Sequence, residues 1–456
     1  MDGMSAVPSP PSVLPFVAGQ PLVDHHCHGV LRAGGDLAGL LNEADGDATA
    51  DGMPFDSLAG LALRRWCPPL LGLAAHASVA SYQERRAALG ADEVNRRFLG
   101  ASGLTALCVD TGYTPADLLL ASGGTTPLTP RVPPEGTTSG TTQVPPGGTT
   151  LGSPQGPPDG SASLGTSLAF QANAPGMLSP GETAGFAGAA AFEVVRLEQV
   201  AESLARSGVR AADFPDEYRK ALSERVTSPS FGIKVVGLKS IAAYRVGLEL
   251  DGPRPGDGEV VAAVSRWLGG TNRAGRDDGD AGTPPRLADE VLHRFFIWCG
   301  ADLGLPIQFH VGYGDRDVDL HRCNPLLLTG LLRALEPTGV PVVLLHNYPY
   351  HREAGYLAQV FPLVHADLGL ATHNVGARSA ALLGEALELV PLRKFLFSSD
   401  AFGLPELYYL GTLLFRRALS AFLAERLAAD DLSYSDAERI TRLIGAENAR
   451  RAYRLD

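Results

Sequence analysis

Two histidines separated by one residue follow an apolar run near the start of the chain. The run Pro21–Val23 leads directly into His26 and His28. Because side chains alternate between the two faces of a strand, His26 and His28 are expected to share one face, while His25 and Cys27 point the other way. Two imidazoles on one face of a strand end can hold one divalent metal ion. Histidine-rich runs also occur on surfaces, so further ligands are needed to support a metal site.

Further polar side chains stand at the ends of later apolar runs, namely Lys239, His310, His346 and Asp400. Each has a simpler explanation on its own. A histidine at a strand end can bond a loop carbonyl, and Asp400 could cap a helix that begins near Pro405. Their shared position at the ends of several runs favours one common site.

The elements that must position these residues alternate between β-rich and amphipathic segments. A helical pattern such as Tyr82–Leu99 lies between the expected strands. This alternation is typical of a (β/α)8 TIM-type barrel, in which function sits at the carboxyl ends of the strands. A doubly wound open sheet is the alternative, but no G-x-G-x-x-G follows the first strand. The expected strands are Leu22–His28, Ala106–Thr111, Phe192–Leu197, Gly232–Lys239, Pro306–His310, Val342–His346, Val364–Leu368 and Phe395–Ser399.

Residues 121–188 differ from the rest of the chain in composition. Gly, Pro, Thr and Ser dominate, Gly-Thr-Thr recurs, and charged residues are scarce. Such a segment cannot bury enough apolar surface to offset its ordering entropy. We therefore expect a long disordered insertion at 121–188 within a single barrel domain covering 1–456, and a surface loop at about 269–285.

Composition limits the partners and the compartment. The net charge is −12, no Lys/Arg block occurs, and 45% of the residues are hydrophobic. We therefore expect a small-molecule substrate as the partner, and neither nucleic acid nor a membrane. The N-terminus lacks the features of a signal peptide, so we expect a cytoplasmic protein. The five cysteines are scattered, which favours reduced thiols. The oligomeric state stays open, a homo-oligomer included.

Several stretches together resemble the metal-dependent amidohydrolase superfamily. The likeness is to the amidohydrolase-related branch, which also forms the N-terminal half of some glutamine-synthetase-fused proteins. It covers nearly the whole chain except the insertion. The matching stretches are Val23–Gly29, Val236–Arg245, Gln308–Asp315, Leu345–Leu357, Phe397–Asp400 and the C-terminal Ile444–Arg451.

The resemblance implies a set of metal ligands and catalytic groups. By position, His26, His28, His310 and Asp400 match the ligands of one divalent metal. Three imidazoles and a carboxylate suit Zn²⁺ best, with Mn²⁺ or Fe²⁺ as alternatives. Asp400 would also transfer a proton, and His346 would polarise the scissile carbonyl or act as an acid or base.

The substrate-binding residues are less sharply defined. Lys239 would either become carboxylated and bridge two metals or, as we favour, pair with an anionic group of the substrate. Tyr244, Arg245 and Arg352 could clamp a carboxylate, although arginines after strands also form structural ion pairs. Asp315 lies near His310 in sequence and could contact substrate, or could simply form a turn.

Three functions are compatible with this pattern. The first is a metal-dependent hydrolase that cleaves a C–N, amide-type bond of a small carboxylate-bearing substrate. The second is a metal-dependent, non-oxidative decarboxylase of the same superfamily. The third is a non-catalytic metal-binding or interaction module linked to nitrogen metabolism, which the complete set of expected ligands disfavours.

Overall fold

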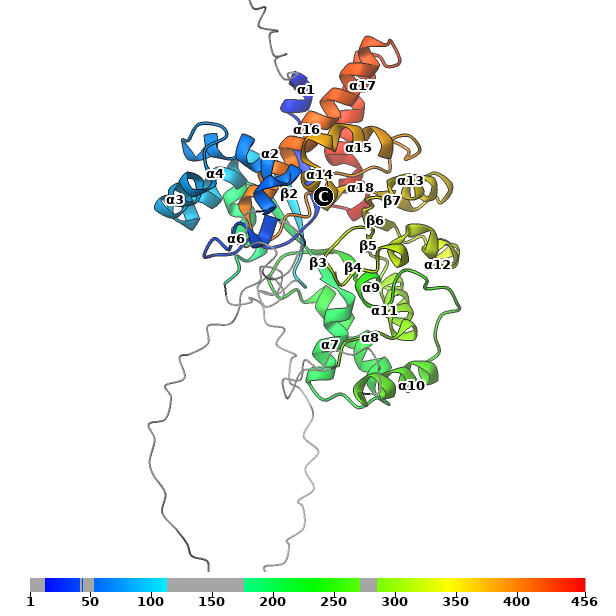
Figure 1. The fold of residues 1–456 in the computed structure, drawn as a ribbon. Helices are drawn as coiled ribbons and strands as arrows, with labels where there is room; N and C mark the ends of the chain where they lie inside the picture. Colours follow the sequence, from blue (N-terminus) through cyan, green and yellow to red (C-terminus); the bar gives the residue numbers. More distant parts are fainter. Residues whose placement is uncertain (1–12, 42, 44–52, 113–175, 271–284, 456) are drawn as a thin grey trace, which may run out of the picture.

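A parallel β-sheet forms the centre of the molecule (Figure 1). The computed structural model describes residues 13–41, 43, 53–112, 176–270 and 285–455. Within these residues seven strands pair in chain order, each parallel to the next. They are β1 (Leu22–Cys27), β2 (Leu104–Asp110), β3 (Ala190–Arg196), β4 (Val235–Ser240), β5 (Ile307–Val311), β6 (Val342–His346) and β7 (Val364–Ala366).

An eighth extended segment closes the sheet between β7 and β1. The Ala366 N–H donates to Lys394 O at 3.0 Å, and the Leu396 N–H donates to Ala366 O at 3.0 Å. On the other side, the His25 N–H donates to Phe397 O at 3.3 Å. The predicted strand Phe395–Ser399 therefore occupies the eighth position of a TIM-type barrel. Its hydrogen bonds are too irregular for a regular strand, because the segment turns sharply at its end.

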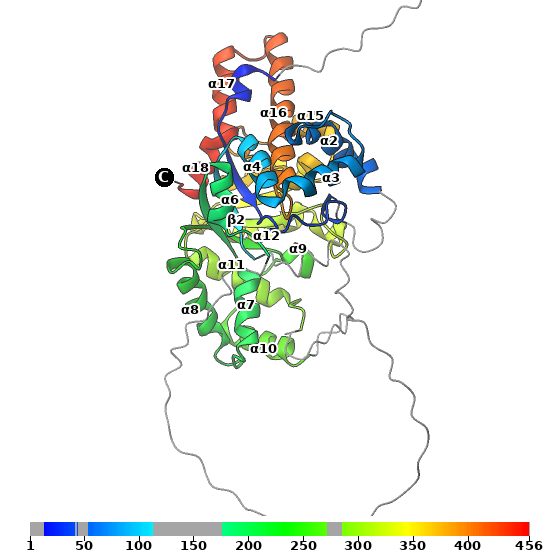
Figure 2. The same cartoon turned by 90° about the vertical axis from the view of Figure 1, so that its left-hand side faces the viewer.

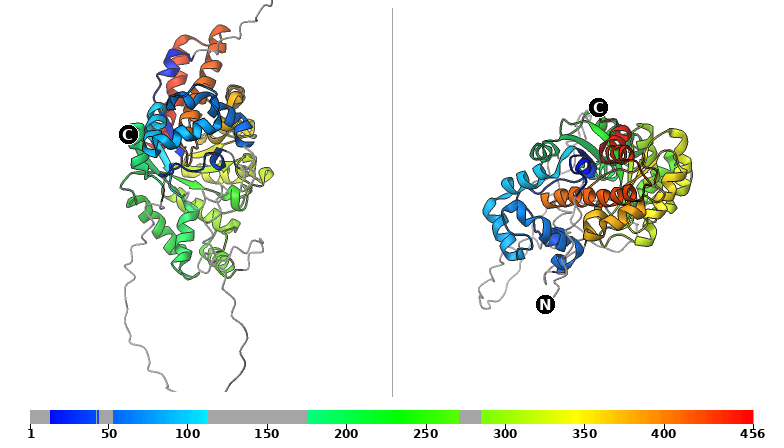
Figure 3. Two further views of the ribbon diagram at one scale, coloured as in Figure 1. Left: turned by 60° about the vertical axis from the view of Figure 1, so that its left-hand side comes forward. Right: turned by 90° about the horizontal axis from the view of Figure 1, so that it is seen from above.

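Helices follow the strands and surround them (Figures 1 and 3). Figures 2 and 3 show α1, α16 and α17 extending beyond one end of the barrel, where Phe16 and Tyr434 pack edge to face. The described α-helices are α1 (Pro15–Ala18), α2 (Leu58–Trp66), α3 (Val79–Leu89), α4 (Ala91–Ser102), α6 (Pro180–Ala187), α7 (Leu197–Arg206), α8 (Phe214–Thr227), α9 (Ala242–Arg245), α10 (Asp257–Leu268), α11 (Glu290–Asp302), α12 (Thr329–Leu335), α13 (His351–Val360), α14 (Gly369–Asn374), α15 (Ser379–Ala386), α16 (Pro405–Ala428), α17 (Tyr434–Arg442) and α18 (Asn448–Tyr453).

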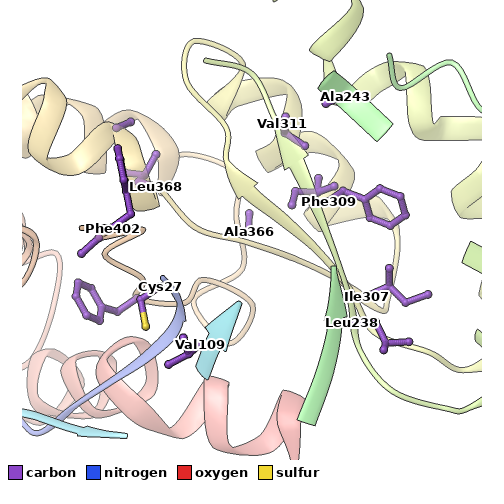
Figure 4. Close-up of a cluster of buried hydrophobic side chains, with 14 of the residues drawn as sticks. Cys27, Val109, Leu238, Ala243, Ile307, Phe309, Val311, Ala366, Leu368 and Phe402 are labelled. Carbon is purple, nitrogen blue, oxygen red and sulfur yellow. The ribbon is translucent and has the colours of Figure 1, made fainter. Parts of the chain in front are cut away.

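The larger apolar core lies between the strands and the helices. Figure 4 shows Leu238, Ile307 and Phe309 projecting to the same side of β4 and β5. Helix α11 packs closely over them at Gly300, where a Cβ would lie 2.8 Å from the Leu238 side chain. Burying apolar surface on this face stabilises the barrel by roughly 25 cal/mol per Å².

A smaller apolar core fills the interior of the barrel. It contains one or two small side chains from most strands, such as Val23, Cys108 and Leu345. Ala449 and Tyr453 of the C-terminal helix α18 belong to the same cluster. Helix α18 therefore covers the apolar interior and helps to hold the strands in register.

Two predicted boundaries differ from the structure. Within the predicted insertion 121–188, residues 121–175 lie outside the described part. Residues 176–188, however, contain helix α6, which begins with a Ser179–Glu182 capping box, so the predicted end at 188 is too late. The pattern Tyr82–Leu99 forms two helices, since Gly90 between α3 and α4 has φ +77° and interrupts the helix.

The structure bears on two expectations from composition. All five cysteines are buried and free of disulfide bonds, as predicted. Among the described helices, none is both long and apolar enough to cross a membrane.

Candidate metal centre

Three side chains from the two segments that close the barrel converge at its carboxyl end. His26 lies on β1, His28 directly follows it, and Asp400 directly follows the eighth segment. Asp400 Oδ1 lies 3.0 Å from His26 Nε2 and 3.3 Å from His28 Nε2. Donor atoms that share one metal through bonds of about 2.1 Å stand about 3 Å apart. The separations therefore match a shared divalent ion.

The backbone at Asp400 is held in an uncommon conformation. Its φ is 51°, in the left-handed region that non-glycine residues seldom adopt, and its N–H donates to His26 O at 3.1 Å. The bond fixes the carboxylate beside β1. The helix-cap explanation for Asp400 is wrong, because Leu404 occupies the N-cap position of α16.

Charge and burial set the protonation states within the cluster. Burial alone would raise the pKa of the Asp400 carboxyl, but its electrostatic interaction with the His346 ring and hydrogen bonds from His26 and His28 hold that pKa well below its usual range. Burial and the nearby Lys239 ammonium lower the pKa of His26 to about 4. An ionised carboxylate beside neutral imidazoles is the state that metal ligation requires.

His310 and His346 lie at the ends of β5 and β6, beside the cluster. Their ring centroids are 4.7 Å apart, and His346 Nε2 lies 3.5 Å from Asp400 Oδ2. Burial, followed by the charge of Lys239, lowers the pKa of His310 to about 3. Burial also lowers the pKa of His346 well below its usual range. Both rings are therefore neutral at neutral pH.

An unsatisfied nitrogen supports the fit of a metal to this site. His310 Nε2 is buried without a hydrogen-bond partner among the described residues. Leaving a buried polar atom unpaired costs about 1–3 kcal/mol, so such an atom calls for a ligand. The geometric group of possible ligands contains His26, His28 and Asp400 but not His310. His310 is thus a neighbour of the cluster whose fourth-ligand role stays a prediction.

Lys239 places a cation directly against the cluster. Its Nζ lies 3.4 Å from His26 Nε2, and the side chain is buried. Burial lowers the pKa of Lys239 to about 8, although the charges of Asp110 and Asp400 act in the opposite direction. A partly deprotonated, buried amine can pair with a substrate carboxylate or accept a carboxyl group, and the geometry is compatible with both.

Tyr244, another predicted substrate residue, contacts His310 beside the cluster. Its hydroxyl lies 3.4 Å from His310 Nδ1, and the two rings are in contact. Gly314 makes room for this pair, since a Cβ there would lie 2.4 Å from the Tyr244 hydroxyl. Tyr244 can therefore orient the His310 ring.

The structure does not bring the other predicted clamp residues to the cluster. Arg245 points toward Glu202 at 3.5 Å and lines a separate cavity of about 390 Å³ with Arg266 and Arg322. Arg352 is a surface residue whose Nε donates to Glu388 at 2.8 Å, so its predicted role as a substrate clamp is not supported. The Arg352 guanidinium pairs with the carboxylates of Glu385 and Glu388, which is the structural ion pair stated above as the alternative.

Asp315 forms the turn that was the alternative to substrate contact. Its Oδ1 accepts the Asp317 N–H at 2.8 Å, and its backbone carbonyl accepts the Val318 N–H. The half-buried carboxylate shapes the loop after β5. The structure therefore gives Asp315 a role in the loop turn, and its contact with substrate stays a prediction.

Several strand-end residues near the cluster were missed by the sequence analysis. Asp110 at the end of β2 accepts from Arg196 at the end of β3 at 2.8 Å and lies 3.9 Å from His28 Nδ1. Asp367, just after β7, contacts the backbone of His346. Each is the second-last residue of an expected strand, so the same search could have found all three if it had covered every acidic and basic residue near a strand end.

His25 also departs from its predicted orientation. A register irregularity between Asp24 and Cys27 interrupts simple alternation along β1. His25 consequently contacts Asp367 at 2.7 Å and Tyr453 at 3.1 Å inside the barrel, instead of pointing outward. The side chains of His25 and His26, although adjacent in the sequence, therefore both lie inside the barrel.

Comparison with known proteins agrees with this geometry. A family model described as amidohydrolase matches residues 245–455. The protein fluG of Emericella nidulans is 29% identical over 300 residues, which are 59% of this chain and 33% of that protein. The chain thus spans about a third of the length of this curated relative.

Solved structures show the same architecture. A protein from Lactobacillus casei described as a metal-dependent hydrolase is similar over 96% of each chain, with 26% identity and a TM-score of 0.68. A uronate isomerase from Bacillus halodurans is similar over 97% of this chain and 95% of its own, with 12% identity and a TM-score of 0.55. The second likeness concerns the fold alone.

Proposed function

Because the chain belongs to the amidohydrolase superfamily, we propose that it is a metal-dependent hydrolase that cleaves a C–N, amide-type bond of a small carboxylate-bearing substrate. The convergence of His26, His28 and Asp400, with the unpaired His310 Nε2 nearby, carries the proposal. These four residues would hold one divalent ion, Zn²⁺ being the best match to the donor set. Such an ion lowers the pKa of a bound water toward 7 and polarises a carbonyl oxygen.

The protein's own groups provide proton transfer and polarisation. Ionised Asp400, with Oδ2 directed toward His346, can accept a proton from the attacking water and pass it to the leaving nitrogen. His346 Nδ1 accepts the Leu370 N–H at 3.4 Å, so its Nε2 carries the proton and faces the site. These contacts support a role for His346 as hydrogen-bond donor to the substrate carbonyl, and its low pKa disfavours a role as a cationic acid.

The substrate carboxylate would bind Lys239. Its buried ammonium is the strand-end cation that touches the cluster, through His26. Burial strengthens its attraction for an anion, because the local dielectric is low. Because Lys239 lies next to the cluster, the substrate carboxylate would lie close to the scissile bond. The substrate would therefore be small.

The same contact gives a reason to test a second function. With Lys239 Nζ only 3.4 Å from a candidate ligand, a bound carboxylate could itself be the reacting group. A non-oxidative decarboxylation would then release carbon dioxide without hydrolysis. The two reactions differ in their products.

The experiment is a product-resolved screen with the purified full chain. The protein would be analysed for bound metal, reconstituted with Zn²⁺, Mn²⁺ or Fe²⁺, and incubated with γ-glutamyl amides, N-acyl amino acids and aromatic carboxylates. Release of ammonia or an amine would support the hydrolase, and release of carbon dioxide the decarboxylase. Exposed His321→Gln is the matched control for His26→Gln. Activity that is equal in both variants would contradict the proposed centre.

A further inference from the structure

A buried carboxylate next to the candidate centre joins three of the strand ends that build it. Asp367 Oδ1 accepts the His346 N–H at 2.6 Å. Its Oδ2 accepts the Ser398 hydroxyl at 2.7 Å and lies 2.7 Å from His25 Nε2. Ser398 is two residues before Asp400, and His25 directly precedes His26. One side chain therefore links the segments that carry His26, His346 and Asp400.

The contact with His346 stabilises a strained turn. His346 and Asn347 both have left-handed backbones, with φ 69° and 60°. Non-glycine residues in such regions cost of order 1–3 kcal/mol each and persist only where surrounding structure holds them. Asp367 holds both, since its carboxylate accepts the His346 N–H and its carbonyl accepts Asn347 Nδ2 at 3.0 Å.

Hydrogen bonds from the C-terminal helix orient His25, the neighbour of Asp367. Gln308 Nε2 donates to Tyr453 Oη at 2.9 Å, so the tyrosine hydroxyl can donate to His25 Nδ1, 3.1 Å away. His25 then carries its proton on Nε2, which faces Asp367. The hydrogen bonds from α18 therefore end at His25, whose Nε2 lies 2.7 Å from the Asp367 carboxylate.

We infer that Asp367 is a positioning residue of the candidate centre: its carboxylate sets the backbone of His346 and, through His25 and Ser398, the relative placement of β1 and the eighth segment. The inference rests on the proposed centre but not on C–N bond cleavage. Asp367 does not reach the cluster itself. It acts on the ligands as outer hydrogen-bond partners do in metal sites, where their loss typically lowers metal affinity 10- to 100-fold.

The test compares Asp367→Asn with the wild-type full chain by two measurements that need no substrate. The first is the nitrogen spectrum of isotope-labelled histidines, with the signals assigned through His25→Gln and His346→Gln. The second is Zn²⁺ affinity, measured by competition with a chromophoric chelator. We expect the His25 and His346 signals to move and the Zn²⁺ affinity to fall roughly 10- to 100-fold.

Glu193→Gln is the matched control, because Glu193 on β3 is an equally buried carboxylate that bonds Thr111, just after β2, and Arg225 on α8. It should lose stability while keeping the His346 signal and the Zn²⁺ affinity. If Asp367→Asn does not fold, Ser398→Ala removes one of the three contacts and should produce the same changes at smaller size. Unchanged histidine signals and Zn²⁺ affinity in a folded Asp367 or Ser398 variant would overturn the inference. A wild type that binds no Zn²⁺ would count against the proposed centre, while the histidine spectra would still test Asp367.

Discussion

The residues of the candidate centre combine protonation states and backbone conformations that are costly outside such a site. The buried His26, His310 and His346 rings have lowered pKa values, and Asp400 stays ionised. His346, Asn347 and Asp400 all have positive φ. Such strain persists where surrounding contacts determine it and is concentrated at functional sites. The conformations therefore support the same location for the site as the ligand pattern.

Asp400→Asn should separate chemistry from folding. Asparagine tolerates the left-handed backbone at φ 51° and keeps one oxygen, but it loses the charge and the basicity. We expect the thermal midpoint to stay near that of wild type, while turnover falls by at least roughly 10²-fold and Zn²⁺ binds more weakly. Turnover and calorimetry on the same preparations check this. Wild-type turnover in the variant would remove Asp400 from the mechanism.

Gly369→Ala should displace the His346 ring. A Cβ at residue 369 would lie 2.6 Å from His346 Nδ1 and 2.8 Å from Ser398 Oγ. Such overpacking typically costs 1–3 kcal/mol, so we expect a lower unfolding free energy and a shifted His346 signal. Gly384→Ala in α15 is the control, because a Cβ there meets open space and should leave the signal in place. Equal stability of the two variants would contradict the close packing.

The sequence identified the residues of the cluster better than the residues that support them. His26, His28 and Asp400 follow from spacing and strand ends, which are local properties. Arg352 matched a family stretch, yet its guanidinium pairs with Glu388, a partner that only the packing of α13 beside residues after α15 reveals. Asp367 was missed because its importance lies in contacts with residues far away in the sequence.

At the scale of elements, alternation predicted the order of the strands but not their regularity. The eighth segment forms only an isolated bridge with β7 and is not a regular strand. The turn that directly follows it, at Asp400, orients the Asp400 side chain. The division of Tyr82–Leu99 depended on Gly90 alone, whose left-handed backbone ends α3. The periodic pattern of apolar residues thus predicts whether a segment is a helix or a strand. The ends of each helix or strand depend on single residues, such as Gly90, which a pattern over many residues does not show.

Deleting residues 121–170 should leave folding and Zn²⁺ binding intact. The composition of this stretch supplies few core-forming side chains, and shortening a connection changes its closure free energy by only about 1 kcal/mol. A second deletion, 179–188, removes α6 with its buried Pro180 and Thr183. We expect that deletion to lower the thermal midpoint sharply, as measured by circular dichroism. Equal losses of folded protein in both deletions would show that the first segment matters structurally.

At the scale of the whole molecule, closure of the barrel connects the two ends of the chain to one site. β1 lies beside the eighth segment, and α18 covers the barrel interior with Tyr453 bonded to His25. The geometry of the centre therefore depends on contacts between residues near 25, 367, 398 and 453. These contacts require the barrel to be closed, so the centre should assemble only when β1 and the eighth segment are paired.

Global stability should fall as the pH drops from about 6.5 to about 4, and His365 on β7 should account for part of the fall. Burial, together with the nearby charges of Lys394 and Arg451, lowers the pKa of His365 from 6.5 to about 4. Between these values the unfolded chain binds a proton that the folded chain does not, so unfolding becomes more favourable as pH falls. The contribution of this group is present above pH 6.5 and amounts to about 3 kcal/mol when fully lost.

Denaturant unfolding of His365→Gln across this range should show a shallower pH dependence than wild type, whereas the exposed His321→Gln should retain the wild-type slope. A wild-type slope in His365→Gln would mean that this histidine is protonated in the folded protein and that other groups cause the acid sensitivity.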